Sequence, residues 1–229
     1  MQPTRATNAD AILGALHLAS PALPVGGFAY SQGLEQAIED RWVTDMETAY
    51  HWIRDGLILN MARQELPWWL ACYAAAASQD WTRVVEVNTY LHAFRETHEF
   101  RLESVQMGHS MAKLFAQWSR GQSLAELTEI VWVYPSAYAA LAAVSGVSRD
   151  LALSAYLWSW VENQVLAAVK SVPLGQIEGQ TLLHRLKDDI IVAMQAADGV
   201  RPEESGSAAF GLAIISARHE TQYSRLFRS

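Results

Sequence analysis

The chain has 229 residues, of which 51% are hydrophobic and only 18% charged, and this composition excludes an intrinsically disordered protein. Its net charge of −7 argues against a nucleic-acid-binding protein, which normally needs a basic surface. The single cysteine, Cys72, excludes a disulfide scaffold and a cysteine-based structural zinc site. The mean hydropathy of +0.02 and the nine tryptophans are high for such a chain, so we expect part of the apolar surface to contact partner proteins.

The chain contains one uncharged stretch, residues 130–148, that is long enough to cross a membrane. Pro135 and Ser136 near its middle, and Ser145 and Gly146 near its end, break it into shorter pieces. The first residues are polar, and the apolar run that follows is too interrupted for a signal peptide. The sequence therefore predicts no membrane span and a soluble, cytoplasmic protein.

Sequence patterns that are typical of helix starts occur in both halves of the chain. Residues 44–47 and 123–126 both have the Ser/Thr-x-x-Glu pattern of a capping box, which starts a helix. Pro67 suits the first turn of a helix through the alanine-rich residues 68–77. Only residues 129–134 resemble a strand, and that run is short.

Apolar residues that recur at intervals of three and four positions predict two longer helices. The first stripe runs from Leu151 to Val169 and the second from Leu183 to Ala197. Breaks between helices are expected around residues 20–27, 79–80, 134–135, 145–150, 172–179 and 198–207. None is long enough for an interdomain linker, so residues 1–229 are predicted to form one all-α bundle of roughly nine or ten helices, with a loop near 198–207.

The sequence offers little catalytic chemistry. No Gly-rich loop ending in Gly-Lys-Ser/Thr is present to hold a nucleotide phosphate, and no Gly-x-Ser-x-Gly elbow carries a nucleophile. Asp188 and Asp189 begin a magnesium-binding pattern, but Val192 stands where the next aspartate is needed. We therefore expect no catalytic residue, and Cys72 is expected to be an inert thiol in an apolar helix.

The seven histidines do not form a recognisable metal site. His98 and Glu99 begin a His-Glu-x-x-His run, but Leu102 replaces the second histidine. Glu99 and Glu103 share a helix face at i,i+4. Because Arg95 and Arg101 lie among these acids, a salt-bridged polar face is the expected interpretation. No permanent metal site is predicted. Weak, transient binding of a metal ion by carboxylate or imidazole groups is the alternative.

Two segments are unusual for their position in the chain. In residues 18–35, Pro21, Pro24, Gly26 and Gly27 fix a turn, which is followed at once by Phe28 and Tyr30. These aromatic side chains either pack into the core or serve as anchors on a rigid loop for a partner. Residues 218–229 alternate Tyr223, Leu226 and Phe227 with three arginines. This composition is typical of a docking tail that becomes ordered on binding, and the alternative is a tail packed back on its own domain.

The same segments resemble the UreF family of urease accessory proteins. The resemblance rests on four stretches in order along nearly the whole chain. They are the Ser-Pro-Ala-Leu-Pro-Val-Gly-Gly-Phe-Ala-Tyr-Ser-Gln-Gly-Leu-Glu run of residues 20–35, and residues 101–108, 169–176 and 218–229. The resemblance implies an all-α, non-catalytic scaffold, commonly a homodimer. In that family the protein lies between UreD (also called UreH) and the GTPase UreG, and the assembly helps to install nickel in apo-urease.

The resemblance also implies roles for particular residues. Phe28 and Tyr30 fall in the N-terminal motif and Arg225, Tyr223 and Phe227 in the C-terminal motif, so all five are expected to contact partners, with UreG as the expected target. Lys170 lies in the 169–176 stretch and is either structural or turned toward the GTPase. Family members are thought to offer an internal passage for nickel, handled transiently without a permanently bound cofactor. By charge alone, the expected lining residues are Glu35, Glu99 and Glu103.

Two other functions stay open at this stage. The chain is alternatively a regulator that alters the GTP hydrolysis cycle of its partner, since an arginine supplied in trans can accelerate phosphoryl transfer by roughly 10³- to 10⁵-fold. The third alternative is a small helical enzyme or metal carrier that acts alone. The lack of a phosphate-binding loop favours the scaffold, because the partner GTPase supplies one.

Overall fold

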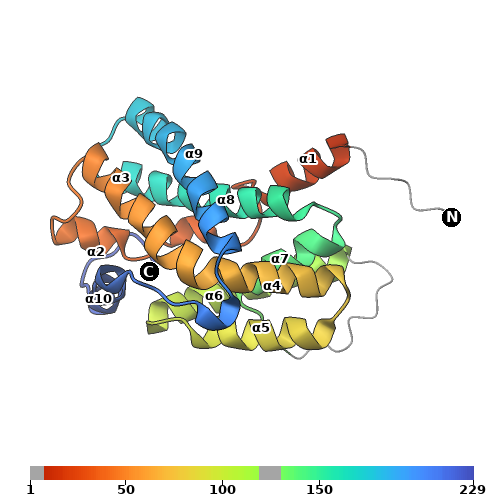
Figure 1. Cartoon of the computed structure of the whole chain (residues 1–229). Helices are drawn as coiled ribbons and strands as arrows, with labels where there is room; N and C mark the ends of the chain where they lie inside the picture. Colours follow the sequence, from red (N-terminus) through yellow and green to blue (C-terminus); the bar gives the residue numbers. More distant parts are fainter. Residues whose placement is uncertain (1–7, 119–129) are drawn as a thin grey trace.

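The structure, a computed structural model, describes residues 8–118 and 130–229, and the regular elements in these ranges are all helices (Figure 1). The all-α prediction is confirmed, and ten α-helices lie in the described ranges. They are α1 (Asn8–Leu18), α2 (Leu34–Glu39), α3 (Met46–Asp55), α4 (Leu66–Ala77), α5 (Trp81–Ala93), α6 (His98–Trp118), α7 (Tyr134–Val144), α8 (Arg149–Ser171), α9 (Gln176–Asp198) and α10 (Phe210–His219). The capping box predicted at residues 123–126 lies outside the described residues.

Helices α3 and α4 form one continuous rod, joined by the π-helical segment η2 (Gly56–Glu65) (Figure 1). A π-helix is rare and wider than an α-helix, and it is often found beside functional sites. Here η2 contacts α9 and supplies wall residues to the central cavity that is described below. The sequence pattern gave no signal for this change in helical geometry.

The core is centred on α7, which packs against α4 and α6. Its alanines, among them Ala139, Ala140 and Ala142, are fully buried and let neighbouring helices approach closely. At Gly108 of α6 the approach is so close that a Cβ atom would lie 2.6 Å from the carbonyl carbon of Val133. The position therefore requires glycine.

The two predicted apolar stripes lie in α8 and α9, which pack against each other. All five residues of the second stripe are buried, which confirms the helical period from which it was predicted. They are Leu183, Leu186, Ile190, Ala193 and Ala197. Helix α4 begins with Pro67 in its first turn, as predicted.

The capping box near residue 44 was predicted one residue too early. Asp45, not Thr44, is the N-cap of α3, and its carboxylate accepts a hydrogen bond of 2.9 Å from the Thr48 amide. The Thr48 hydroxyl in turn accepts a bond from the Asp45 amide at 3.0 Å. Glu47 instead pairs with Arg185 at 2.5 Å, which links α3 to α9.

The predicted loop near residues 198–207 contains a short 3₁₀ helix, η4 (Pro202–Glu204), and is hydrogen-bonded to the α3–η2–α4 rod. The Trp68 indole donates to the Ser205 hydroxyl at 2.8 Å, and the Gly206 amide donates to the Arg63 carbonyl at 3.0 Å. The Ala208 amide then donates to the Leu59 carbonyl at 2.9 Å. These bonds hold the chain in place as it enters α10.

Residues 130–133, the described part of the run that resembles a strand, lead into α7 without regular secondary structure, and they pair with no strand in the part of the chain that the structure describes. The Asn88 side chain satisfies this backbone instead, donating to the Val131 carbonyl at 2.9 Å and accepting from the Val133 amide at 3.0 Å. Within the described ranges, none of the helices combines the length and apolar character that a membrane crossing needs.

Candidate functional site

The first unusual segment makes two left-handed turns before it enters α2. Gly26 has φ +77°, and Gln32 and Gly33 follow with φ +53° and +80°. A Cβ atom at Gly33 would lie 3.3 Å from Ile215 of α10, so backbone angle and packing both favour glycine there. The turn directs Glu35, in the first turn of α2, into the interior, where its exposed fraction is 8%.

Glu35 binds the 218–229 segment through backbone amides. Its carboxylate accepts hydrogen bonds from the amides of Leu226, at 2.6 Å, and Phe227, at 3.0 Å. Bonds to a charged acceptor are roughly twice as strong as neutral ones, and their burial makes the loss of the acceptor costly. Glu35 therefore fixes the backbone of the segment near its end.

Glu99, on α6, binds two side chains of the same segment. One oxygen accepts from the Arg225 guanidinium at 2.5 Å, and the other lies 2.6 Å from Nδ1 of His219. The His219 ring is fully buried, and its second nitrogen lies 3.4 Å from Glu35. The imidazole thus bridges two buried carboxylates that come from different helices.

Glu103, one turn further along α6, binds the last residue of the segment. One carboxylate oxygen accepts from the Gln32 amide at 2.6 Å and the other from the Ser229 hydroxyl at 2.7 Å. Burial raises the pKa of Glu103 above its ordinary value, and the Gln32 and Ser229 hydrogen bonds partly oppose the rise. We call Glu35, Glu99 and Glu103 together the carboxylate clasp.

The backbone completes this attachment. The Arg228 amide donates to the Ala29 carbonyl at 2.8 Å, and the Ser31 amide donates to the Ser229 carbonyl at 2.7 Å. The 26–31 turn and the end of the 218–229 segment therefore lie side by side. In this structure the segment is packed back on its own domain, the second of the two alternatives, because three buried carboxylates and backbone bonds hold it there, and its docking role stays a prediction.

The predicted partner contacts divide into buried and exposed residues. Tyr30 is 5% exposed, and its hydroxyl donates to Gln106 at 2.6 Å, while Phe227 is 6% exposed. In this structure both side chains attach their segments to the core instead of offering a surface. Phe28 is 67% exposed and the Tyr223 side chain is fully exposed, so these two are placed as a partner contact requires.

The two predicted basic residues have intramolecular partners. Arg225 is engaged by Glu99, and its guanidinium Nε also donates to the Gln222 carbonyl at 3.1 Å. Lys170 is exposed at the end of α8, with its ammonium group 5.7 Å from the centre of the Phe227 ring. A cation at this distance stabilises an aromatic ring, so Lys170 helps to cover Phe227.

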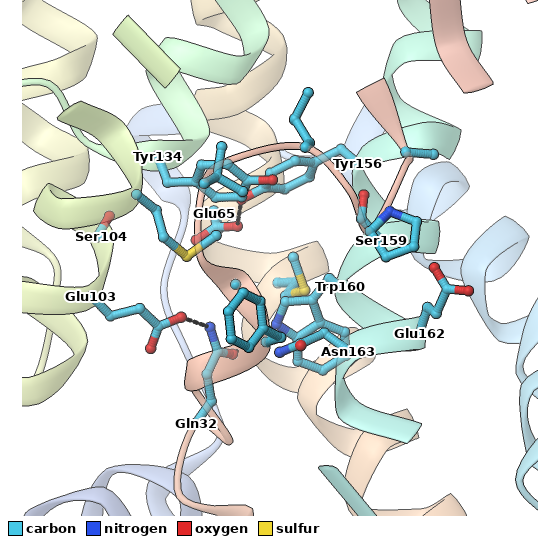
Figure 2. Close-up of a pocket in the computed structure, with 18 of the residues that line it drawn as sticks. Gln32, Glu65, Glu103, Ser104, Tyr134, Tyr156, Ser159, Trp160, Glu162 and Asn163 are labelled. Atoms are coloured by element: carbon cyan, nitrogen blue, oxygen red, sulfur yellow. Dashed lines mark hydrogen bonds between the residues drawn. The ribbon is translucent and has the colours of Figure 1, made fainter. Parts of the chain in front are cut away.

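A cavity of about 110 Å³ lies beside the clasp, which we call the central cavity (Figure 2). The 18–32 segment, η2, α6 and α8 form its walls. Glu103 and the buried Ser104 of α6 face it from one side, and Ser159, Glu162 and Asn163 of α8 face it from the other (Figure 2). Ser104 Oγ has no hydrogen-bond partner, and burial raises the pKa of Glu162.

One wall of the central cavity carries a buried ion pair that sequence reasoning missed. Arg95 pairs with Glu65 of η2, and the Tyr156 hydroxyl donates to the same carboxylate at 2.6 Å. Burial disfavours the charge on Arg95, but the adjacent Glu65 carboxylate keeps its pKa above the ordinary value. Salt bridges are present in this cluster, as predicted, but their partners come from other elements: Arg95 pairs with Glu65 of η2, and Glu99 pairs with Arg225 of the 218–229 segment.

The three glutamates that were expected to line a nickel passage lie in two different surroundings. Of the three predicted glutamates only Glu103 lines the central cavity, whereas Glu35 and Glu99 bind the 218–229 segment. Glu65 and Glu162 line it as well, and nothing in their sequence context marked them. Among the described residues, no group of three or more His, Cys, Asp or Glu side chains has the geometry to hold a metal ion.

Comparison with known proteins decides the family. The UreF family model matches residues 43–187. The urease accessory protein UreF of Cupriavidus metallidurans is 47% identical over 225 residues, which cover 95% of this chain and 97% of the relative. The corresponding protein of Cupriavidus pinatubonensis is 46% identical over 226 residues, with the same coverage.

The chain belongs to the UreF family. The UreF protein of Cupriavidus taiwanensis extends the match to 97% of this chain and 100% of its own length, at 44% identity. The resemblance drawn from residues 20–35 and 218–229 is therefore confirmed. Within this UreF-family fold, the two motifs that carried the resemblance are bonded to each other through the carboxylate clasp.

Proposed function

We propose that this chain is a non-catalytic scaffold of urease maturation that acts in the cytoplasm with UreD/UreH and the GTPase UreG to assemble the nickel centre of apo-urease. The observation that carries the proposal is the 44–47% identity to curated urease accessory proteins UreF over 95–97% of the chain. The structure supports a docking role through the exposed aromatic residues next to the clasp.

The proposed docking surface consists of Phe28, Tyr223 and Leu226. Their exposed fractions are 67%, 105% and 74%, which is unusual for apolar side chains fixed on a bonded backbone. The clasp holds this backbone, so a partner that binds here does not need to order a free tail. We propose UreG as the protein that contacts this surface.

Nickel is, in this proposal, cargo of the complex and not a resident cofactor of the chain. The central cavity is the place we propose for the family's nickel passage, because Glu65, Glu103 and Glu162 all line it. Carboxylate oxygens and a hydroxyl such as Ser104 bind a divalent cation weakly enough to release it. A homodimer belongs to the same proposal, and it would cover exposed apolar side chains such as Leu13 and Leu16 of α1.

The regulatory alternative depends on a cation supplied to the GTPase. Arg225 is poorly placed for that role, since both Glu99 and the Gln222 carbonyl hold its guanidinium. Lys170 is exposed, but it lies over Phe227. A GTP turnover assay with UreG, in the presence and absence of this chain, separates the two functions, because a scaffold alone leaves the turnover rate unchanged.

The proposal is tested by co-purification of this chain with UreD/UreH and UreG. Tyr223→Ala and Phe28→Ala should reduce recovery of UreG without a change in circular dichroism. Phe210→Ala is the matched control, since Phe210 is an aromatic residue that is 75% exposed but lies at the opposite end of α10 from His219. Equal recovery of UreG with all three variants would contradict the proposed docking surface.

A further inference from the structure

His219, the last residue of α10, has a fully buried imidazole ring that lies between two carboxylates. Nδ1 of the ring lies 2.6 Å from Oε2 of Glu99, on α6, and Nε2 lies 3.4 Å from Oε2 of Glu35, on α2. The ring belongs neither to the proposed docking surface nor to the lining of the central cavity. It nevertheless contacts two of the carboxylates that hold the 218–229 segment.

These two contacts require a proton on each nitrogen of the ring. A neutral imidazole has one N–H group and one lone pair, whereas a protonated imidazole donates from both nitrogens. The atoms that face the ring are oxygens of Glu35 and Glu99, and an ionised carboxylate can only accept. In either neutral form, one lone pair of the ring would therefore face a carboxylate oxygen. The arrangement of His219 thus favours the imidazolium form.

The balance of charge around the ring favours the same form. Glu35 and Glu99 contribute two negative charges, and Arg225 contributes one positive charge through its 2.5 Å bond to the other oxygen of Glu99. With a neutral His219 this largely buried cluster has one net negative charge, whereas an imidazolium makes it neutral. An unbalanced buried charge is costly, so attachment of the segment and protonation of the ring support each other.

The other charged groups of the neighbouring elements have their own partners. Glu103 of α6 bonds to the end of the segment, and Arg218 of α10 pairs with Asp40, which follows α2, at 2.6 Å. Glu220 accepts a hydrogen bond from the amide of His98 at 2.9 Å. The helix ends also support the charges of the central pair, since Glu99 lies in the first turn of α6 and His219 in the last turn of α10.

A change in the charge of His219 would reach the segment through the same two carboxylates. Glu99 binds both the ring and Arg225, and Glu35 binds both the ring and the amides of Leu226 and Phe227. When the ring loses its second proton, one carboxylate loses its donor and faces a lone pair. Movement of either carboxylate away from the ring disturbs a bond that holds the segment.

We propose that His219 makes the attachment of the 218–229 segment sensitive to pH: the protonated ring holds the segment on α2 and α6, and loss of the proton loosens it. Because the attached state favours the bound proton, the attachment is complete at lower pH and weakens as the pH rises through the titration of the ring. Tyr223 and Leu226 lie in this segment, so the docking surface loses its fixed backbone at higher pH. That last consequence rests on the proposed function, whereas the pH-sensitive attachment does not.

The test follows the segment with a nitroxide spin label in the full-length protein. Ser224→Cys places the label at an exposed position of the segment, and the buried Cys72 does not compete for the reagent. Electron paramagnetic resonance should show a mainly immobile label at about pH 6 and a mobile one at about pH 9. The ratio of mobile to immobile label should rise at least about tenfold, because a hydrogen bond to a charged group is lost. The same label at Gln180→Cys, on the exposed face of α9, is the control and should not respond.

Two variants in the labelled chain assign the response to the ring. In Glu99→Gln, the new amide can donate to Nδ1 while its oxygen still accepts from Arg225, so a neutral ring that donates from Nε2 to Glu35 fits the cluster. We therefore expect the response to reverse, with a less mobile label at about pH 9 than at about pH 6. His219→Gln removes the titrating group and should abolish the response.

Three results would overturn the proposal. They are equal mobility of the label at both pH values, an unchanged response in His219→Gln, and a response of Glu99→Gln in the same direction as the parent chain. A response that persists in His219→Gln would assign the effect to Glu103 instead. Recovery of UreG at the two pH values is a separate measurement. Unchanged recovery with a responsive label would contradict the docking role and leave the pH-sensitive attachment standing.

Discussion

Nδ1 of His219 lies 2.6 Å from Oε2 of Glu99, and both side chains are buried. The two residues are 120 positions apart in the sequence, and their contact joins α10 to α6. Glu35, on α2, approaches the same imidazole from the other nitrogen. Three helices are thus connected at the point where the 218–229 segment begins, so the clasp supports the fold and the proposed docking surface together.

Removal of the Glu35 carboxylate should release the end of the segment. Glu35→Ala leaves the amides of Leu226 and Phe227 without their acceptor, and we expect a loss of about 2–4 kcal/mol in the free energy of unfolding. Hydrogen exchange at residues 226–229 should become faster. Glu39→Ala, on the exposed side of the same helix, is the control, and slow exchange at 226–229 in Glu35→Ala would disprove the role of the clasp.

Substitutions at Phe227 and Tyr223, two aromatic residues of the 218–229 segment, should have different effects on stability and on UreG binding. Phe227→Ala removes a buried ring and should lower stability by about 3 kcal/mol, the lower end of the usual cost. Tyr223→Ala, at a fully exposed position, should change stability by less than about 0.5 kcal/mol while it reduces UreG recovery. Thermal unfolding and pull-down on the same preparations measure both effects, and loss of stability in Tyr223→Ala would count against its exposed placement.

The raised pKa of Glu103 predicts a dependence of stability on pH. Burial favours the protonated carboxyl group of Glu103 in the folded chain. The protonated group therefore contributes its full stabilisation at pH values below its ordinary pKa of about 4.5, and this contribution is lost as the pH rises through its higher pKa in the folded chain. Glu103→Gln keeps groups that can bond to Gln32 and Ser229 but carries no charge. It should therefore be more stable than the parent chain at pH 7.5, and this gain should vanish toward pH 4.

The control for this prediction is Glu39→Gln, which removes a charge at an exposed position. Chemical denaturation at several pH values measures the difference for both variants. At each pH the free energy of unfolding of Glu103→Gln is compared with that of the parent chain. If this difference is less favourable to the variant at pH 7.5 than at acid pH, the ionised carboxylate is the favoured form and the prediction is wrong.

The close approach at Gly108 predicts a marked effect of a single methyl group. Gly108→Ala places a Cβ atom 2.6 Å from the backbone of Val133, and backbone cannot yield as a flexible side chain would. We expect a loss of about 1–3 kcal/mol, which corresponds to a melting temperature lower by roughly 3–10 °C. Gly206→Ala, where nothing lies within 4 Å, is the control, and similar melting temperatures for the two variants would refute the packing argument.

Much of this fold was predictable because apolar periodicity reports burial directly. The stripes of α8 and α9 and the Pro67 start of α4 were all placed correctly, and Cys72 is buried as expected, with its pKa raised to about 12 by burial. The start of α3 was displaced by one residue, since Thr44 and Asp45 are both good N-caps and only the geometry shows which one bonds.

The site was harder to predict because its contacts join residues far apart in the sequence. Glu99 and Glu103 at i,i+4 look the same on a solvated face and on a buried one, and the difference is made by Arg225 and Ser229, more than 100 residues away. The aromatic residues of the segment likewise gave no sign that Phe227 is buried and Tyr223 exposed. The motifs indicated which segments matter but not that they bind each other.

The central claim is tested most directly by activation of apo-urease in vitro with UreD/UreH, UreG, GTP, bicarbonate and nickel. We predict that urease activity appears only when this chain is added, and that the Phe28→Ala, Tyr223→Ala double variant reduces the activation while Phe210→Ala does not. Full activation without this chain would contradict the account.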